Sequence, residues 1–201
     1  MQLIGMMDSA FVRRVAITMH MLGIAFEHRP ISVFSTYERF RAINPVVKAP
    51  TLVCDDGVQL MDSTLIIDYL EAVAGRSLMP SAIEERRAAL RLIGLALVAC
   101  EKTAQCVHER RLRPNETRHK PWEQRILHQL VAALEELEHA LAEAPLECDA
   151  TIGQAGVTVA VSWRFTQLLV PELIDPAAFP ALAQYSSKAE LLPAFIAAPP
   201  L

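Results

Sequence analysis

The sequence predicts a small α/β domain followed by an all-helical domain, and three observations support this prediction. Asp55, Asp56 and Gly57 separate two short apolar runs, and Asp-Gly in such a place is a strong signal for a β-hairpin. Apolar residues recur at three- and four-residue spacing over residues 10–22, which predicts an amphipathic helix. Beyond the first domain the helical spacing continues and no strand pattern appears.

The first domain has the predicted element order β-α-β-α-β-β-α. Its strands are expected at residues 2–5, 26–30, 51–54 and 58–61, and its helices at residues 10–22, 35–43 and 63–74. Gly23 and Gly75 follow the first and third of these helices, and glycine is the preferred residue just past a helix end.

The second domain opens with Ser81–Glu84, which has the Ser-x-x-Glu pattern of a capping box. Long helices are expected from there to residue 112 and over residues 121–144, and a third helix, apolar nearly all round and therefore central, over residues 157–170. The proline-rich remainder allows only short helices. We place the first domain at 1–76, a linker at 77–82 and the helical domain at 83–201.

Composition and charge exclude several classes of partner. The chain has 201 residues, 52% of them hydrophobic, and a formal net charge of −4 with acidic and basic residues intermixed, so nucleic acid is not expected to bind. No apolar run is long enough to span a membrane, and no signal peptide is visible. The cysteines form no C-x-x-C pair, and Cys100 and Cys106 fall on different helix faces, so no metal site is expected. Together these features predict a cytoplasmic protein with reduced thiols.

Three segments resemble the glutathione transferase superfamily, in the order and at the spacing of that family. Residues 9–15 (SAFVRRV) are similar to the S/C-P-F-x-x-R-V start of helix one in tau-like, omega-like and many bacterial members. Residues 44–53 (NPVVKAPTLV) resemble N-P-x-x-K-V-P-x-L, and residues 61–70 (MDSTLIIDYL) resemble E/D-S-x-x-I-x-x-Y-L. The resemblance implies that residues 1–76 form a thioredoxin-like, glutathione-binding domain and that the remainder is the all-α C-terminal domain.

The resemblance further implies a glutathione S-transferase, which conjugates the thiolate of its co-substrate glutathione to an electrophilic small molecule. It implies a homodimer, and it requires no metal. The residues that it assigns to glutathione are Ser9, Phe11, Lys48, Ala49, Pro50, Asp62 and Ser63.

Ser9 is the predicted catalytic residue. It stands between the first strand and the first helix, where helical N–H groups and the positive end of the helix dipole point. A serine at a helix start is by itself more often a cap, but the resemblance favours a hydroxyl that donates to the glutathione sulfur, and one residue can do both. Because a hydroxyl cannot form the mixed disulfide that family members with cysteine form at this position, conjugation is favoured over redox exchange.

The other assigned residues have structural alternatives. The resemblance implies a cis Ala49–Pro50 bond, and backbone groups of Ala49 that pair with the cysteinyl backbone of glutathione. Lys48 could reach the glycyl carboxylate, or could be an ordinary solvated lysine. Ser63 could hold the γ-glutamyl carboxylate at a helix start and Asp62 its ammonium group, or Ser63 could only cap the helix while Asp62 interacts favourably with the helix dipole.

Two departures and two alternative functions remain. Ala10 replaces the usual proline, and Gln154–Val157 stands where the family shows an S/T-x-x-D capping box, so this helix is expected to start differently. One alternative is a non-catalytic binding or regulatory protein like the bacterial stringent-starvation proteins. The other is a glutathione-dependent isomerase or dehalogenase, which shares the first site and differs in the acceptor pocket.

Overall fold

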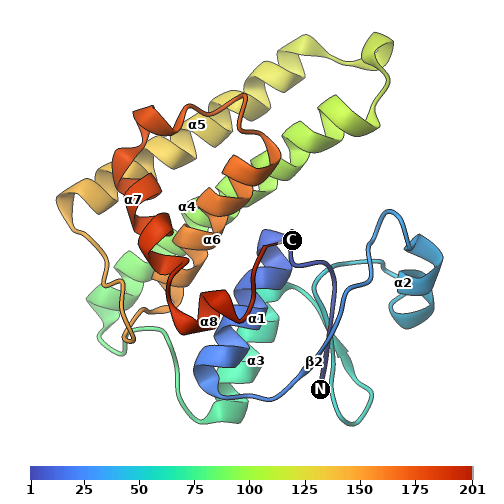
Figure 1. The fold of residues 1–201 in the computed structure, drawn as a ribbon, viewed down its shortest axis with the longest axis vertical. Helices are drawn as coiled ribbons and strands as arrows, with labels where there is room; N and C mark the ends of the chain where they lie inside the picture. Colours follow the sequence, from blue (N-terminus) through green and yellow to red (C-terminus); the bar gives the residue numbers. More distant parts are fainter. Residues whose placement is uncertain (201) are drawn as a thin grey trace. The chain divides into compact units, whose positions relative to one another are not determined.

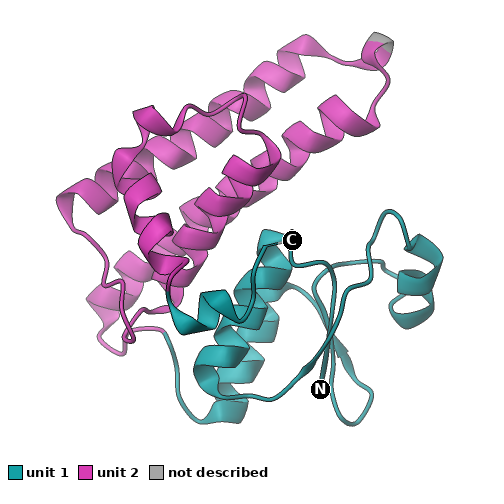
Figure 2. Ribbon diagram, viewed as in Figure 1, with its two compact units in different colours: residues 1–78, 192–201 teal, residues 79–191 magenta. Residues whose placement is uncertain are grey.

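The computed structural model describes residues 1–200, except for the side chain of Glu116. The chain divides into two compact units (Figure 2). Unit 1 comprises Met1–Leu78 together with the C-terminal segment from Leu192, and unit 2 comprises Met79–Leu191. Within the described residues, no helix has both the length and the apolar character needed to cross a membrane.

Unit 1 has the predicted order β-α-β-α-β-β-α, which is confirmed element by element (Figure 1). Its elements are β1 (Gln2–Ile4), α1 (Ala10–Leu22), β2 (Glu27–Arg29), α2 (Tyr37–Ile43), β3 (Thr51–Val53), β4 (Gln59–Leu60) and α3 (Ser63–Ala74), joined by the late helix α8 (Pro193–Ile196). Gly23 and Gly75 adopt the left-handed conformation directly after α1 and α3, as their positions predict.

The four strands form one mixed sheet in the order β2-β1-β3-β4. β1 runs parallel to β2, and it pairs antiparallel with β3, whose Leu52 lies opposite Leu3. Because neighbouring residues of a strand face opposite sides of the sheet, Leu3 and Ile4 belong to hydrophobic cores on opposite faces of the sheet. Ile4 packs with Ile31 and with Phe40 of α2, all buried. α1 and α3 pack against each other, on the side of the sheet away from α2 in Figure 1.

The C-terminal segment belongs to unit 1, whereas the predicted boundaries place it in the helical domain. The reason is Arg13 of α1, which is only 2% exposed. Its Nε donates a hydrogen bond of 2.7 Å to the carbonyl oxygen of Ala198, and its guanidinium lies 5.6 Å from the ring centroid of Phe195. Phe195 and Ala198 are themselves buried. A buried arginine thus joins α1 to a segment that is more than 180 positions away in the chain.

Unit 2 is helical throughout, as predicted. It contains α4 (Ile83–Val107), a π-helical turn (His108–Leu112), a 3-10 turn (Asn115–Thr117), α5 (Lys120–Glu143), α6 (Gln154–Leu169), a second 3-10 turn (Pro176–Ala178) and α7 (Pro180–Ala189). α6 is buried along most of its length, which confirms it as the central helix. The predicted capping box is wrong, because α4 begins one residue later, with Ala82 as its N-cap and no side-chain cap bond.

The start of α6 explains why the S/T-x-x-D pattern is missing. The N-cap is Gly153, so the two positions of a capping box are 153 and 156. Both residues are glycine, and they lie one residue earlier than the positions that the family resemblance implies. A Cβ atom at Gly156 would lie 2.2 Å from the Tyr185 hydroxyl and 2.8 Å from Cγ1 of Ile152. The Tyr185 hydroxyl donates to the carbonyl oxygen of Glu147 at 3.0 Å, and burial raises the pKa of this phenol. Tyrosine therefore occupies the space of the missing acidic side chain.

We expect Gly156→Ala to lower the free energy of unfolding by about 1–3 kcal/mol, because the added methyl group overpacks the Tyr185 contact. Helix propensity alone predicts the opposite, a gain of up to about 1 kcal/mol. The matched control is Gly94→Ala in α4, where a Cβ meets nothing within 4 Å and a gain is expected. Urea unfolding of both variants measures the two signs, and stabilisation by both would contradict the packing argument.

Candidate glutathione site

The first part of the candidate site is the N-terminal end of α1, where Ser9 is the N-cap residue. Its backbone is extended, its carbonyl oxygen accepts the first helical hydrogen bond from the Arg13 N–H at 2.9 Å, and its own N–H donates to Met6 at 3.1 Å. The side chain, which is partly exposed, makes no capping hydrogen bond. The hydroxyl of Ser9 is thus available, beside N–H groups of the first turn that no side chain caps.

The loop that leads to Ser9 is held close to the segment that contains Ala49. Gly5 has a φ of +140°. Both of its backbone polar groups are hydrogen-bonded to β2: the N–H donates to the Arg29 carbonyl oxygen at 3.1 Å, and the carbonyl oxygen lies 2.8 Å from His28 Nε2. A Cβ at Gly5 would lie 2.5 Å from Cγ2 of Val12 and 3.4 Å from Cβ of Ala49. Only glycine allows this approach, which places the start of the Ser9 loop against residue 49.

The second part is the segment from Asn44 to Thr51. Asn44 is 1% exposed, and its side-chain nitrogen donates to Oγ1 of Thr51 at 2.8 Å, while Thr51 donates to the Lys48 carbonyl oxygen at 2.6 Å. The Ala49–Pro50 bond is cis, as the family resemblance implies. Val47 has a φ of 53°, a left-handed conformation that costs a β-branched residue about 1–2 kcal/mol. This side-chain network therefore holds a strained segment in one conformation.

Ala49 presents its backbone as a binding edge requires. The residue is partly exposed, and neither its N–H nor its carbonyl oxygen is hydrogen-bonded to any described residue. Lys48 and Phe11, which also belong to the predicted set, are exposed and partly exposed respectively. No hydrogen bond or ion pair joins the side chain of either residue to the described part of the chain.

The third part is the N-terminal end of α3. Asp62 is the N-cap, and its carboxylate accepts a hydrogen bond of 2.8 Å from the Thr64 N–H, so the cap of α3 is this aspartate and not Ser63, to which the structural alternative assigned it. Ser63 is only 1% exposed, and its hydroxyl oxygen accepts from Nη1 of Arg14 at 3.1 Å. The same nitrogen donates to Oγ1 of Thr64 at 3.1 Å.

Arg14 contacts the predicted site although it is not among the residues predicted to bind glutathione. It is 2% exposed and lies in α1, five positions after Ser9, so it links the first and third parts of the site. An arginine can only donate hydrogen bonds, and Ser63 must therefore accept with a lone pair. The hydroxyl proton of Ser63 then points away from Arg14. The signal in the sequence is the arginine of the S/C-P-F-x-x-R-V pattern.

A cavity in unit 1 lies apart from these residues. It has a volume of about 450 Å³ and is lined by Met7, His20, Ile24, Phe26, His28 and the C-terminal segment around Ala197. None of the predicted glutathione-binding residues lines it. Burial lowers the pKa of His20, so this cavity is flanked by a neutral imidazole and an aromatic ring 5.2 Å away. Among the described residues no three His, Cys, Asp or Glu side chains cluster as metal ligands do.

Comparison with known sequences identifies the first unit. Residues 3–77 match the family described as glutathione S-transferase, N-terminal domain. The "uncharacterized GST-like protein YibF" of Escherichia coli (strain K12) is 34% identical over 71 residues, which is 35% of this chain and 35% of that protein. The alignment thus spans about a third of the curated relative's length.

Solved structures extend the likeness of fold to the whole chain. A glutathione transferase family member from Pseudomonas fluorescens Pf-5, solved with bound glutathione, is 25% identical with a TM-score of 0.83, covering 100% of this chain and 98% of that one. The maleylacetoacetate isomerase of Methylobacterium extorquens AM1, solved with malonate and glutathione, is 27% identical with a TM-score of 0.73, covering 100% and 97%. The matched first domain and the fold of both units agree with the three motifs of residues 1–75. Residues 3–77 are thus a glutathione S-transferase N-terminal domain, and the whole chain has the fold of the solved glutathione transferase family member.

Proposed function

We propose that this protein is a glutathione transferase that binds glutathione on unit 1 and stabilises its thiolate with Ser9. The observation that carries the proposal is the Ser9 hydroxyl, which lies at the N-terminal end of α1 and is not used to cap it. The similar protein from Pseudomonas fluorescens Pf-5 has been solved with glutathione bound, which supports the choice of co-substrate.

The energetic demand on this site is small. A free thiol has a pKa near 8.5, so half-ionisation at pH 7 requires a drop of about 1.5 units, or roughly 2 kcal/mol. A hydrogen bond from a hydroxyl to a charged sulfur contributes about 1.5–3 kcal/mol, and the helix dipole adds about 0.3–1 kcal/mol. Ser9 and the helix end together meet this demand without a separate base.

The remaining residues bind the rest of the tripeptide in this proposal. The free backbone groups of Ala49 pair with the cysteinyl backbone, as an added strand would. The γ-glutamyl carboxylate lies against Ser63 and the helix end of α3, where N–H groups and the dipole favour an anion. Asp62 forms an ion pair with the ammonium group, and Lys48 forms an ion pair with the glycyl carboxylate. Ser9 carries a hydroxyl where a redox-active member has a thiol, so the proposed reaction is addition of the glutathione thiolate to an electrophile. The proposed location is the cytoplasm.

An isomerase is the second candidate, and a specific similarity favours it. The similar maleylacetoacetate isomerase was solved with glutathione, so the same first site is compatible with isomerisation. The two activities differ in whether the glutathione sulfur stays on the product. A transferase incubated with a generic aromatic electrophile yields a stable glutathione adduct. The non-catalytic alternative is tested separately: retention on immobilised glutathione without turnover favours a binding protein.

Ser9→Ala is expected to lower kcat/KM for conjugation by about 10- to 100-fold, because the variant loses a hydrogen bond of about 1.5–3 kcal/mol to the thiolate. The thiolate is the reactive form, so the rate rises with pH through the pKa of bound glutathione. Without Ser9 this pKa returns toward 8.5, and the rising limb shifts to higher pH. Ser81→Ala, which changes an exposed serine just before α4, is the matched control. An unchanged pH profile in Ser9→Ala would rule out the proposed role.

Ser63→Ala is expected to raise KM for glutathione about tenfold or more and to change kcat less, because it loses a hydrogen bond to a charged carboxylate. Thr64→Ala is the matched control, since Arg14 donates to both hydroxyls at 3.1 Å. Both variants therefore lose one contact to Arg14, but only Ser63 is proposed to touch the ligand. Equal effects of the two substitutions on KM would show that Ser63 is only a structural partner of Arg14.

The homodimer of the family is the proposed assembly, and the outer face of α3 supports it. Leu65, Tyr69 and Val73 are 64%, 36% and 49% exposed, and their spacing of four residues places them in one apolar stripe. Leu65→Glu is expected to shift the protein to monomer in sedimentation velocity, because a charge would be buried in the interface. Leu191→Glu, at a leucine that is 75% exposed in unit 2, is the control and should leave the oligomeric state unchanged. A wild-type monomer would overturn this part of the proposal.

A further inference from the structure

The end of the α4–α5 hairpin concentrates positive charge. Residues 108–125 comprise the π-helical turn, the connection and the start of α5, and we call them the hairpin tip (Figure 1). They include six arginine and lysine residues and three glutamates, a formal net charge of +3. Of the 19 basic and 23 acidic residues of the chain, 13 and 20 remain outside the tip, a net charge of −7. The tip is therefore a basic patch on an otherwise acidic protein.

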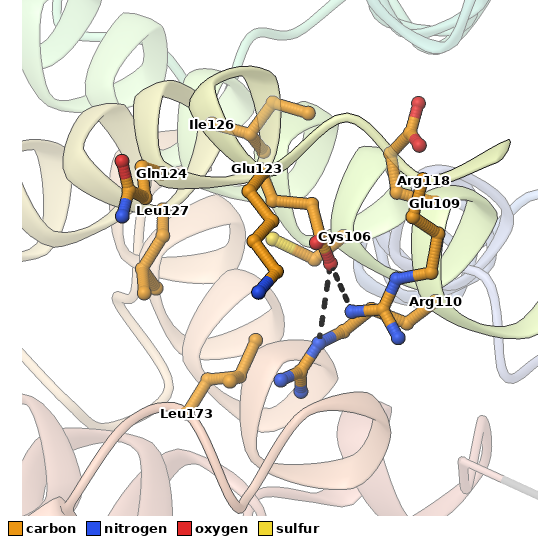
Figure 3. A pocket seen from close by; sticks show the side chains of 10 residues that line it. Cys106, Glu109, Arg110, Arg118, Glu123, Gln124, Ile126, Leu127 and Leu173 are labelled. Carbon is orange, nitrogen blue, oxygen red and sulfur yellow. Dashed lines mark hydrogen bonds and ion pairs between the residues drawn. The ribbon is translucent and has the colours of Figure 1, made fainter. Parts of the chain in front are cut away.

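Three arginines of the tip pair with three carboxylates. The cations are Arg110, Arg113 and Arg118, and the carboxylates are Glu109, Glu123 and Glu172. Figure 3 shows Arg110 and Arg118 turned toward Glu123, whose carboxylate lies 3.7 Å from Nε of Arg110. These six charges sum to zero, and their ion pairs join the π-helical turn to α5.

The other three cations of the tip have no carboxylate partner among the described residues. They are Arg111, Lys120 and Arg125, and all three are exposed. Arg111 donates to the carbonyl oxygen of Leu169 at 2.7 Å, a neutral acceptor that leaves its charge uncompensated. The next glutamate along α5 is Glu135, ten residues or about 15 Å beyond Arg125. This exceeds the Debye length of about 8 Å at physiological ionic strength, so the carboxylates farther along the helix are screened from the tip.

Two large apolar side chains are exposed at the same end of the hairpin. Leu112, the last residue of the π-helical turn, is 59% exposed, and Trp122, in the first turn of α5, is 41% exposed. The connection between the helices runs from one to the other, so they flank it from its two sides. Tryptophan is enriched where proteins meet the headgroup region of a membrane, because its ring is amphipathic. Unpaired cations interspersed with exposed leucine and tryptophan are typical of a segment that lies on a membrane surface.

We propose that the hairpin tip docks on an anionic lipid surface. Arg111, Lys120 and Arg125 contact lipid phosphates, and Leu112 and Trp122 enter the boundary between headgroups and acyl chains. The contact is peripheral, since no described helix is suited to span a bilayer. A nucleic acid backbone offers phosphates but no apolar layer for the leucine. A stable protein interface takes about 20–30 residues from each side, more than the 18 residues of the tip supply.

The first test is flotation of the protein with vesicles of phosphatidylcholine that contain about one third phosphatidylglycerol. We expect binding that weakens as salt is added, because exposed charges are screened. Vesicles of phosphatidylcholine alone are expected to bind at least about tenfold more weakly, since each arginine or lysine contributes about fivefold near an anionic surface.

Tryptophan fluorescence locates the contact. The chain has two tryptophans, and Trp163 is only 4% exposed within α6, so Trp122 is the one that a lipid surface reaches. We expect a blue shift of the emission on addition of the anionic vesicles, and quenching by brominated lipid. Both signals should be lost in Trp122→Phe. Binding that leaves the emission of the wild-type protein unchanged would overturn the proposed insertion.

Matched variants separate the tip from general electrostatics and stickiness. Lys120→Gln is expected to weaken binding to the anionic vesicles about fivefold. Lys188→Gln removes the same charge from an exposed position of α7 and should change binding less than about twofold. Leu112→Ala is expected to weaken binding at least about threefold, and Leu191→Ala, at a leucine that is 75% exposed elsewhere in unit 2, less than about twofold.

Several outcomes would overturn the proposal. They are absence of vesicle binding, equal binding to vesicles of phosphatidylcholine alone, equal losses in the two lysine variants, and equal losses in the two leucine variants. Retention of duplex DNA at the same phosphate concentration, without vesicle binding, would identify a nucleic acid as the partner and would overturn it as well.

Discussion

Unit 1 depends on two consecutive arginines that are buried in its first helix. Arg13 donates to the Ala198 carbonyl oxygen, and Arg14 donates to the hydroxyls of Ser63 and Thr64. A guanidinium inside a protein is costly unless hydrogen bonds replace its lost water, so each arginine stabilises the fold only while its distant segment is in place. The start of α1 is thereby coupled to the start of α3. The proposed thiolate donor and the proposed carboxylate site share one rigid support.

This coupling marks the limit of what the sequence predicts. The order of strands and helices in unit 1 follows from local signals, such as the Asp-Gly hairpin and the glycines after α1 and α3, and it is confirmed. The place of the C-terminal segment is not local. Arg13 resembles any polar residue of an amphipathic helix, and a carbonyl oxygen such as that of Ala198 has no sequence signature. For the same reason, Arg14 is visible only as one letter of a family pattern.

The start of α6 shows a local rule overruled by tertiary packing. The capping box needs a side chain at the third helical position, but the Tyr185 hydroxyl takes that space and bonds Glu147 instead. The helix consequently begins at Gln154 with a glycine N-cap, and burial of nearly every residue compensates for the missing cap. The departure from the family pattern is thus a repacking around tyrosine. It lies in unit 2 and leaves the residues assigned to glutathione unaltered.

Ser9 shows how a helix start can serve two purposes. Capping uses a lone pair of the hydroxyl, whereas stabilising a thiolate uses its proton, so the two roles are chemically compatible. A hydroxyl that caps the helix, however, accepts a hydrogen bond from a backbone N–H, and this bond holds the side chain in one rotamer. Leaving the cap unmade forgoes about 0.5–2 kcal/mol of helix stability, and it leaves the hydroxyl free to rotate toward a ligand sulfur. The two buried arginines hold α1 in place without that cap. In the proposed site, long-range bonds to Arg13 and Arg14 therefore maintain the helix whose first residue is kept for glutathione.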